Sequence, residues 1–149
     1  MFTLKHSSLG LGLLLTSALL STAALAEGPK VTVYKSPTCG CCTQWISHLR
    51  KDGFDVDPVD VKDLSIVKSM SGIKPEQASC HTAQVDGYVI EGHVPADDIR
   101  RLLAERPDAR GLTVPGMPMG SPGMDSPNPQ HYQVLLIGKD GSTQVFAEH

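Results

Sequence analysis

Three of the four cysteines lie within four residues, in the segment Cys39-Gly40-Cys41-Cys42, and the fourth is Cys80. Thiols at this density support two kinds of chemistry. Cys39 and Cys42 have the C-x-x-C spacing of a redox pair, in which one thiolate attacks a disulfide and the second thiol completes the exchange. Alternatively, all four thiolates are soft ligands that converge on a metal ion.

Cys41 discriminates between these interpretations. It lies inside the C-x-x-C pair and would compete with Cys39 and Cys42 for partners, so the sequence favours the metal site over simple dithiol–disulfide exchange. Two structural disulfides are a third interpretation, because an even number of cysteines in an oxidising compartment usually pairs. Adjacent cysteines such as Cys41 and Cys42 seldom pair with each other, however, since the bridge would strain the peptide between them.

The methionines of segment 111–131 favour a softer ion than zinc. Met117, Met119 and Met124 lie there among many glycines and prolines. Thioether sulfur is a poor ligand for zinc and a good one for Cu(I). Isolated methionines usually fill cores, but this segment has few apolar residues for them to pack against. We therefore expect copper at the cysteine site, and bridging thiolates would allow several ions per chain.

Two histidines lie near the expected site. His81 directly follows Cys80, and His93 precedes Val94 and Pro95. Imidazole nitrogen is a ligand of intermediate softness that would help to hold Cu(II). Each histidine also has an interpretation without a metal bond, because His81 would equally serve to orient a ligand and His93 to cap the following helix.

The elements that must position these residues alternate between strands and helices. Asp86-Gly87 is a hairpin turn signal, and Pro58 suggests that its strand lies at an edge of the sheet or is irregular. Met70 falls on a helical stripe expected to face the core. Strands are expected at 30–34, 54–61, 79–85, 88–90, 132–137 and 143–147, and helices from about Cys39 to Lys51, from Asp63 to Gly72, and between Pro95 and Pro107.

This order predicts a thioredoxin/glutaredoxin-like α/β fold, a mixed sheet flanked by helices, with an added methionine-rich loop and a C-terminal hairpin. In glutaredoxin-like proteins a cis-proline segment packs against the redox cysteines. Here Ser79-Cys80-His81-Thr82 matches that position, which would bring Cys80 to the Cys39–Cys42 cluster. The alternative register gives the role to Thr113-Val114-Pro115.

Residues 1–26 have the pattern of a cleaved signal peptide, with Lys5 before an apolar run and Ala24-Leu25-Ala26 as the cleavage site. The mature chain would be a single domain of residues 27–149 in the periplasm, with no membrane segment after cleavage. The formal net charge of −3 at pH 7 argues against nucleic acid as a partner, because phosphate binding needs a basic surface.

Four motifs in order resemble the CopG-type periplasmic copper-resistance proteins, and together they span nearly the whole mature chain. They are Cys39-Gly40-Cys41-Cys42 with Trp45, Ser79-Cys80-His81-Thr82, the stretch 87–95, and the stretch 114–124. The resemblance implies a thioredoxin-like fold, a cysteine-bridged multicopper site, and interconversion of Cu(I) and Cu(II) in copper homeostasis.

By motif match, the resemblance carries over Cys39, Cys41, Cys42 and Cys80 as copper ligands. Met117 and Met124 follow, and Met119 lies at a less constrained position. The partners it implies are copper ions and other periplasmic copper-handling proteins. A thiol–disulfide oxidoreductase that uses Cys39 and Cys42 stays open as the alternative function.

Overall fold

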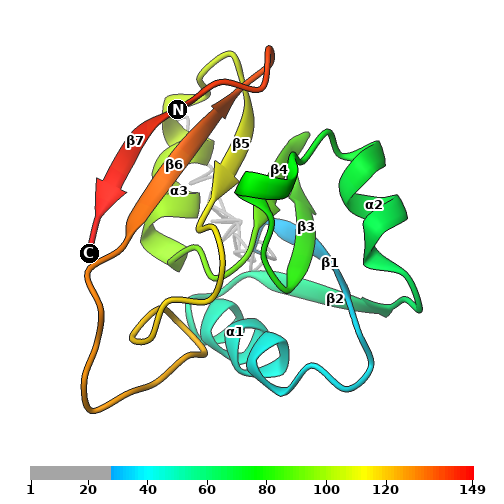
Figure 1. Ribbon diagram of the computed structural model, residues 1–149, viewed down its shortest axis with the longest axis vertical. Helices are drawn as coiled ribbons and strands as arrows, with labels where there is room; N and C mark the ends of the chain where they lie inside the picture. The colour runs from blue at the N-terminus through cyan, green and yellow to red at the C-terminus, as the bar shows by residue number, and fades with distance from the viewer. Residues whose placement is uncertain (1–27) are drawn as a thin grey trace, which may run out of the picture.

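The computed structural model describes residues 28–149 (Figure 1), so the signal peptide predicted at 1–26 lies outside the described residues. Three α-helices and one 3-10 helix alternate with seven strands in this part of the chain. They are β1 (Lys30–Lys35), α1 (Gly40–Lys51), β2 (Asp55–Asp60), α2 (Leu64–Met70), η1 (Pro75–Gln77), β3 (His81–Val85), β4 (Tyr88–Glu91), α3 (Ala96–Glu105), β5 (Ala109–Thr113), β6 (Gln133–Gly138) and β7 (Thr143–Glu148).

The strands form one mixed sheet in the order β2-β1-β3-β4-β5-β6-β7. β2 runs parallel to β1, and β3 runs antiparallel to both β1 and β4. This half of the sheet has the predicted thioredoxin-like topology. Pro58 lies in β2 at the edge of the sheet, where its missing N–H removes no ladder hydrogen bond. Asp86 and Gly87 form the predicted turn, both with positive φ (47° and 85°).

Helices α1 and α3 lie on one face of the sheet and contact each other. The ring nitrogen Nε2 of His48 accepts a hydrogen bond from the Ala96 N–H at 3.1 Å, so α1 caps the start of α3. Trp45, fully buried, donates from its indole nitrogen to the Val94 carbonyl at 2.8 Å. The core therefore fixes the first turns of α1 against the segment that leads into α3.

Helix α2 lies on the opposite face, and here one prediction is wrong. Lys68 of α2 reaches the side chains of Thr82 and Glu91, which alternate along their strands with the core residues Ala83 and Ile90. Met70 was expected in the core but is 85% exposed, and α2 has no buried residue. The spacing of the apolar residues in α2 predicted a buried face. The short helix contacts the sheet through residues such as Lys68, and Met70 lies outside that contact.

The irregular segment predicted at 111–131 begins later than expected, because Gly111–Thr113 belong to β5. This strand runs parallel to β4 and antiparallel to β6, in the middle of the added half of the sheet. A Cβ at Gly111 would lie 1.7 Å from the Val89 carbonyl oxygen, so only glycine permits this strand pairing. The loop proper starts at Val114. No helix of the described residues is long and apolar enough to cross a membrane.

Candidate metal centre

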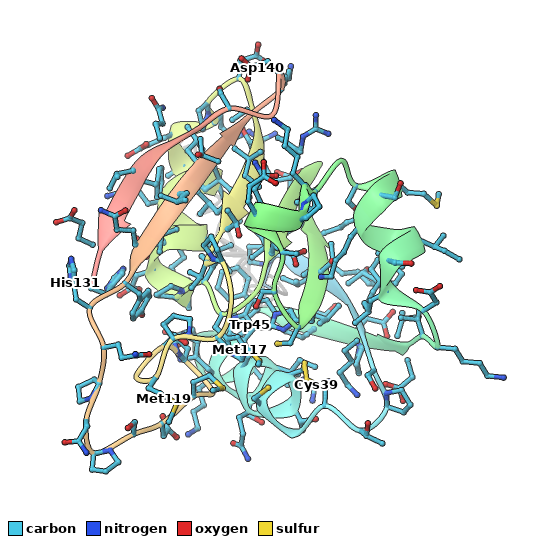
Figure 2. The ribbon with its side chains drawn as sticks, viewed as in Figure 1. Cys39, Trp45, Met117, Met119, His131 and Asp140 are labelled. Carbon is cyan, nitrogen blue, oxygen red and sulfur yellow. A yellow bond between two sulfur atoms is a disulfide. The ribbon has the colours of Figure 1, made fainter. Side chains whose placement is uncertain are left out.

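The first turn of α1 carries three of the sulfurs. Cys39 is the N-cap residue, and its Sγ accepts a hydrogen bond from the Cys42 N–H at 3.3 Å. The turn Ser36–Cys39 that precedes the helix is closed by the Cys39 N–H and the Ser36 carbonyl at 3.1 Å. Cys39 and Cys42 form a disulfide, while Cys41 and Cys80 are free. Figure 2 shows Cys39 where the chain enters α1.

Strand register brings Cys80 to this turn. β1 and β3 are antiparallel with Lys35 opposite His81, so Cys80 lies beside the residues that leave β1 for α1. The Cys80 Sγ lies 3.6 Å from the Cys42 Sγ and 3.9 Å from the Cys41 Sγ. The predicted approach of Cys80 is confirmed. Neither alternative segment contains a cis-proline, since no peptide bond of the described residues is cis.

The spacing of the sulfurs suits a shared metal ion. All four Sγ atoms lie within 4.8 Å of one another, and those of Cys39 and Cys41 are 3.5 Å apart. Two thiolates on a tetrahedral ion with metal–sulfur bonds of about 2.3 Å would be separated by roughly 3.8 Å. In the disulfide state only Cys41 and Cys80 offer free thiols, so reduction of the bridge is needed before four thiolates are available.

Cys80, His81 and His93 form a second potential ligand group, whose donor atoms also lie within 4.8 Å of one another. The His93 Nε2 is 3.0 Å from the Cys80 Sγ. The other ring nitrogen, Nδ1, donates to the Pro122 carbonyl at 2.7 Å, because a carbonyl can only accept. His93 is therefore held as the tautomer whose Nε2 has a free lone pair toward the cysteines.

His81 is fully buried between Trp45 and His93. Its ring centroid lies 4.3 Å from that of Trp45 and 5.2 Å from that of His93. Nδ1 is 3.4 Å from the Cys80 Sγ, whereas Nε2 has no hydrogen-bond partner among the described residues. The structure brings both predicted histidines to Cys80, and the His81 Nδ1 is the atom directed toward its sulfur.

Burial controls the protonation of this group. It lowers the pKa of His81 to about 3, and repulsion from the His93 imidazole, once that ring is protonated at low pH, and from the Lys68 ammonium lowers it further. Burial also lowers the pKa of His93, and it raises the pKa of the Cys80 thiol to about 12, with Cys41 as the second cause. Both imidazoles are therefore neutral at pH 7, which is the form that binds metal, and a metal at Cys80 must displace a proton.

The methionine loop is attached to the cysteine site at two points. Near its start, the Gly116 N–H donates to the Ala78 carbonyl at 3.0 Å, and the Ser79 hydroxyl donates to the Gly116 carbonyl, next to Met117. At its middle, Gly123 packs so closely on α1 that a Cβ there would lie 2.7 Å from the Cys41 carbonyl oxygen. These contacts hold the backbone of both Met117 and Met124 beside the residues that carry the thiols.

The three loop methionines differ in their surroundings. Met117 is 50% exposed and Met124 is half-buried. Met119 is 38% exposed; its N–H donates to the Gln130 side-chain oxygen Oε1 at 3.0 Å, and its carbonyl accepts the Gln130 N–H at 2.8 Å, at the far end of the loop. In the view of Figure 2, Met117 lies between Met119 and Cys39. The anchored positions Gly116 and Gly123 are thus the sequence neighbours of Met117 and Met124, whereas Met119 is hydrogen-bonded to Gln130.

Comparison with known proteins shows which family the chain belongs to. Two solved structures, described as copper resistance protein copG in forms 2 and 1, are each 44% identical to the chain, with TM-scores of 0.79 and 0.78. Each alignment covers 83% of this chain, and 99% and 98% of the respective structures. The chain belongs to the CopG family. A family profile described as a protein of unknown function, DUF411, matches residues 77–124. No curated protein sequence matches the chain.

A buried ion pair behind Cys80 was not predicted from the sequence of this CopG-family chain. The Glu91 carboxylate is fully buried and lies 2.5 Å from the Lys68 ammonium. It also accepts the Ser79 N–H at 2.6 Å and the Thr82 hydroxyl at 2.7 Å. These two partners flank Cys80 in the sequence, so Glu91 holds both ends of the turn that presents the thiol. Burial raises the pKa of Glu91, and the bonds from Lys68, Thr82 and Ser79 oppose that rise.

Proposed function

We propose that the chain is a periplasmic copper-binding protein of copper resistance or homeostasis. The observation that carries the proposal is the convergence of four sulfurs, within 4.8 Å of one another, from the start of α1 and from Cys80, which directly precedes β3. Membership of the CopG family supports copper as the metal, since the similar solved structures are described as copper resistance proteins. The signal-peptide pattern of residues 1–26 supports export to the periplasm.

In this proposal, Cys39, Cys41, Cys42 and Cys80 bridge several copper ions once the disulfide is reduced. Met117 and Met124 supply thioether sulfur from the loop that covers the site, with Met119 as a further candidate. His93 and His81 supply nitrogen, and this mixed donor set suits both Cu(I) and Cu(II). The site would therefore tolerate a change in the oxidation state of its copper, which is the basis for interconversion.

Anaerobic titration of the reduced protein with Cu(I), followed by metal analysis, tests the proposal. We expect several Cu(I) ions per chain, and a cooperative loss of uptake when any one of the four cysteines is replaced by serine. Met70→Leu is the control, because Met70 is exposed on α2 and belongs to no ligand group, so this substitution of a sulfur-containing residue should leave uptake unchanged. Uptake of at most one weakly held ion would contradict the proposal.

The Cys39–Cys42 disulfide supports a second candidate function, that of a thiol–disulfide oxidoreductase. This function requires a thiolate at a helix N-terminus, and Cys39 has that position. Insulin reduction by the metal-free protein measures it. Activity that needs Cys39 and Cys42 and survives both Cys41→Ser and the Met117/Met124 double substitution would favour this function over copper binding.

A further inference from the structure

The four cysteines are divided into two pairs that have different oxidation states. Cys39 and Cys42 are joined, and each contacts one free thiol, because the Cys39 Sγ is 3.5 Å from the Cys41 Sγ and the Cys42 Sγ is 3.6 Å from the Cys80 Sγ. A cysteine pair that can open and close a disulfide within a candidate metal site stores two electrons in its reduced, dithiol form, next to the metal. The following inference rests on the proposed copper function and adds a source of electrons to it.

We propose that the reduced Cys39–Cys42 pair is the electron donor that converts Cu(II) to Cu(I) at this centre, and that Cys41 and Cys80 hold the Cu(I) produced. Each thiolate of the pair gives one electron to one Cu(II). The two sulfurs then form a single S–S bond, two Cu(I) ions result, and the two thiol protons are released to water. The reaction describes a single turnover of the reduced chain.

Geometry makes Cys39 and Cys42 the pair that closes. Their Cα atoms are 5.3 Å apart across the first turn of α1, within the range that a disulfide spans without backbone movement. The Cys39 sulfur also accepts the Cys42 N–H at the helix N-terminus, an environment that favours a thiolate. Cys41 and Cys80 have their sulfurs 3.9 Å apart on different elements, and each keeps a free thiol that can bind one of the two Cu(I) ions.

The other ligands are arranged for both oxidation states. His93 Nε2 approaches Cys80 with its orientation fixed by Pro122, and imidazole is a ligand suited to Cu(II). Thiolate and thioether sulfur are suited to Cu(I). When disulfide formation withdraws two thiolates from the centre, the free thiols and the loop methionines still provide soft ligands, so reduction need not eject the ion.

The test adds two equivalents of Cu(II) per chain to fully reduced, metal-free wild-type protein under anaerobic conditions. Cu(I) is measured with a chromogenic Cu(I) chelator, and free thiols are alkylated before peptide mass spectrometry. We expect two Cu(I) ions and one Cys39–Cys42 disulfide per chain. The matched control is the same wild-type protein with this disulfide formed beforehand, for which we expect loss of Cu(II) reduction.

Two variants separate the roles of the pairs. Cys39→Ser should lose the two-electron yield, whereas Cys41→Ser should still reduce Cu(II) and form the Cys39–Cys42 disulfide but should not retain the Cu(I), which the chelator then captures at once. Uptake of Cu(I) in the direct titration, without a Cys39–Cys42 disulfide after Cu(II), would overturn this inference and leave the copper function standing. A disulfide that maps to Cys41 and Cys80 would overturn it too. Failure to take up Cu(I) at all would instead overturn the proposed function.

Discussion

Glu91 is the residue whose role is least evident from its place in the sequence. It accepts hydrogen bonds on both sides of Cys80 and neutralises Lys68, whose ammonium group is itself largely buried. A buried ion pair adds little net stability when it is intact, but removal of one partner leaves an uncompensated charge. The value of the pair therefore lies in fixing the Ser79–Thr82 turn, and with it the position of the Cys80 sulfur.

We predict that Glu91→Gln destabilises the metal-free protein by about 3–5 kcal/mol, as expected when one partner of a buried pair is removed. Urea unfolding measures the change. Asp108→Asn is the matched control, because Asp108 pairs with Lys139 and both side chains are exposed, and loss of such a pair costs up to about 1 kcal/mol. Equal effects of the two substitutions would show that the Glu91 pair has no special structural role.

His81 makes the stability of the metal-free protein depend on pH. Its pKa in the folded state is about 3, below the unfolded value of about 6.5, so the unfolded chain binds more protons between these values. Stability is therefore complete above the unfolded pKa and is lost as the pH falls toward the folded pKa. Each unit of pKa difference corresponds to roughly 1.4 kcal/mol.

We predict that the free energy of unfolding of metal-free protein decreases between pH 7 and pH 4, and that His81→Phe flattens this dependence. Denaturant unfolding at a series of pH values measures it. His93 contributes in the same direction, because its pKa is also lowered by burial, so some dependence should persist in the variant. An unchanged slope in His81→Phe would contradict the assignment to His81.

At the scale of elements, the loop after β5 depends on a glycine contact. Gly123 has φ of +86°, and a Cβ there would lie 2.7 Å from the Cys41 carbonyl oxygen and 2.8 Å from the backbone nitrogen of Trp45. A side chain at this position must lift the loop from α1. The same loop carries Gly116 at φ +70°, where a Cβ would meet nothing within 4 Å.

We predict that Gly123→Ala accelerates the loss of Cu(I) to a competing chelator several-fold, because it moves Met124 away from the thiols. Gly116→Ala is the matched control, since it introduces a similar backbone strain of about 1 kcal/mol without the clash. Stopped-flow chelator competition gives both rates. If both variants release copper at the same rate, close packing of the loop on α1 does not matter for retention.

Element order was the part of the fold that sequence patterns predicted best. The expected strand–helix alternation and the Asp86-Gly87 turn place Cys80 opposite the start of α1, and the structure confirms this. Patterns failed where tertiary contacts decide the outcome. Met70 fits the spacing of an apolar helical stripe, but a stripe is buried only where another element packs on it, and Met70 is 85% exposed. Gly111 resembles loop sequence, and its role in β5 depends on the close approach of Val89.

The buried pair of Lys68 and Glu91 escaped prediction for the same reason. Charged residues at the end of a strand and on a short helix are normally exposed, and nothing in their spacing shows that they meet. The state of the cysteines is likewise not encoded by their spacing. The spacing predicted that the four sulfurs converge, but only the structure shows that Cys39 and Cys42 are joined while Cys41 and Cys80 are free.

For the whole molecule, the candidate centre joins parts of the chain that are far apart in sequence. Its donors come from the first turn of α1, from the residues that begin β3, from the segment before α3, and from the loop between β5 and β6 (Figure 1). A metal bound there links the thioredoxin-like half of the sheet to the loop of the added half. Binding should therefore stabilise the fold and order the loop together.

We predict that Cu(I) raises the free energy of unfolding of the reduced protein, by about 2.7 kcal/mol when free copper is 100 times the dissociation constant. Hydrogen exchange should slow within residues 114–131 as well as in the first turn of α1. Zn²⁺ is the matched control, because four thiolates can bind it but thioethers bind it poorly, so it should protect α1 and leave the loop unchanged. For both metals, addition of a chelator should reverse the stabilisation. Equal protection of the loop by Cu(I) and Zn²⁺ would show that the methionines take no part in copper binding.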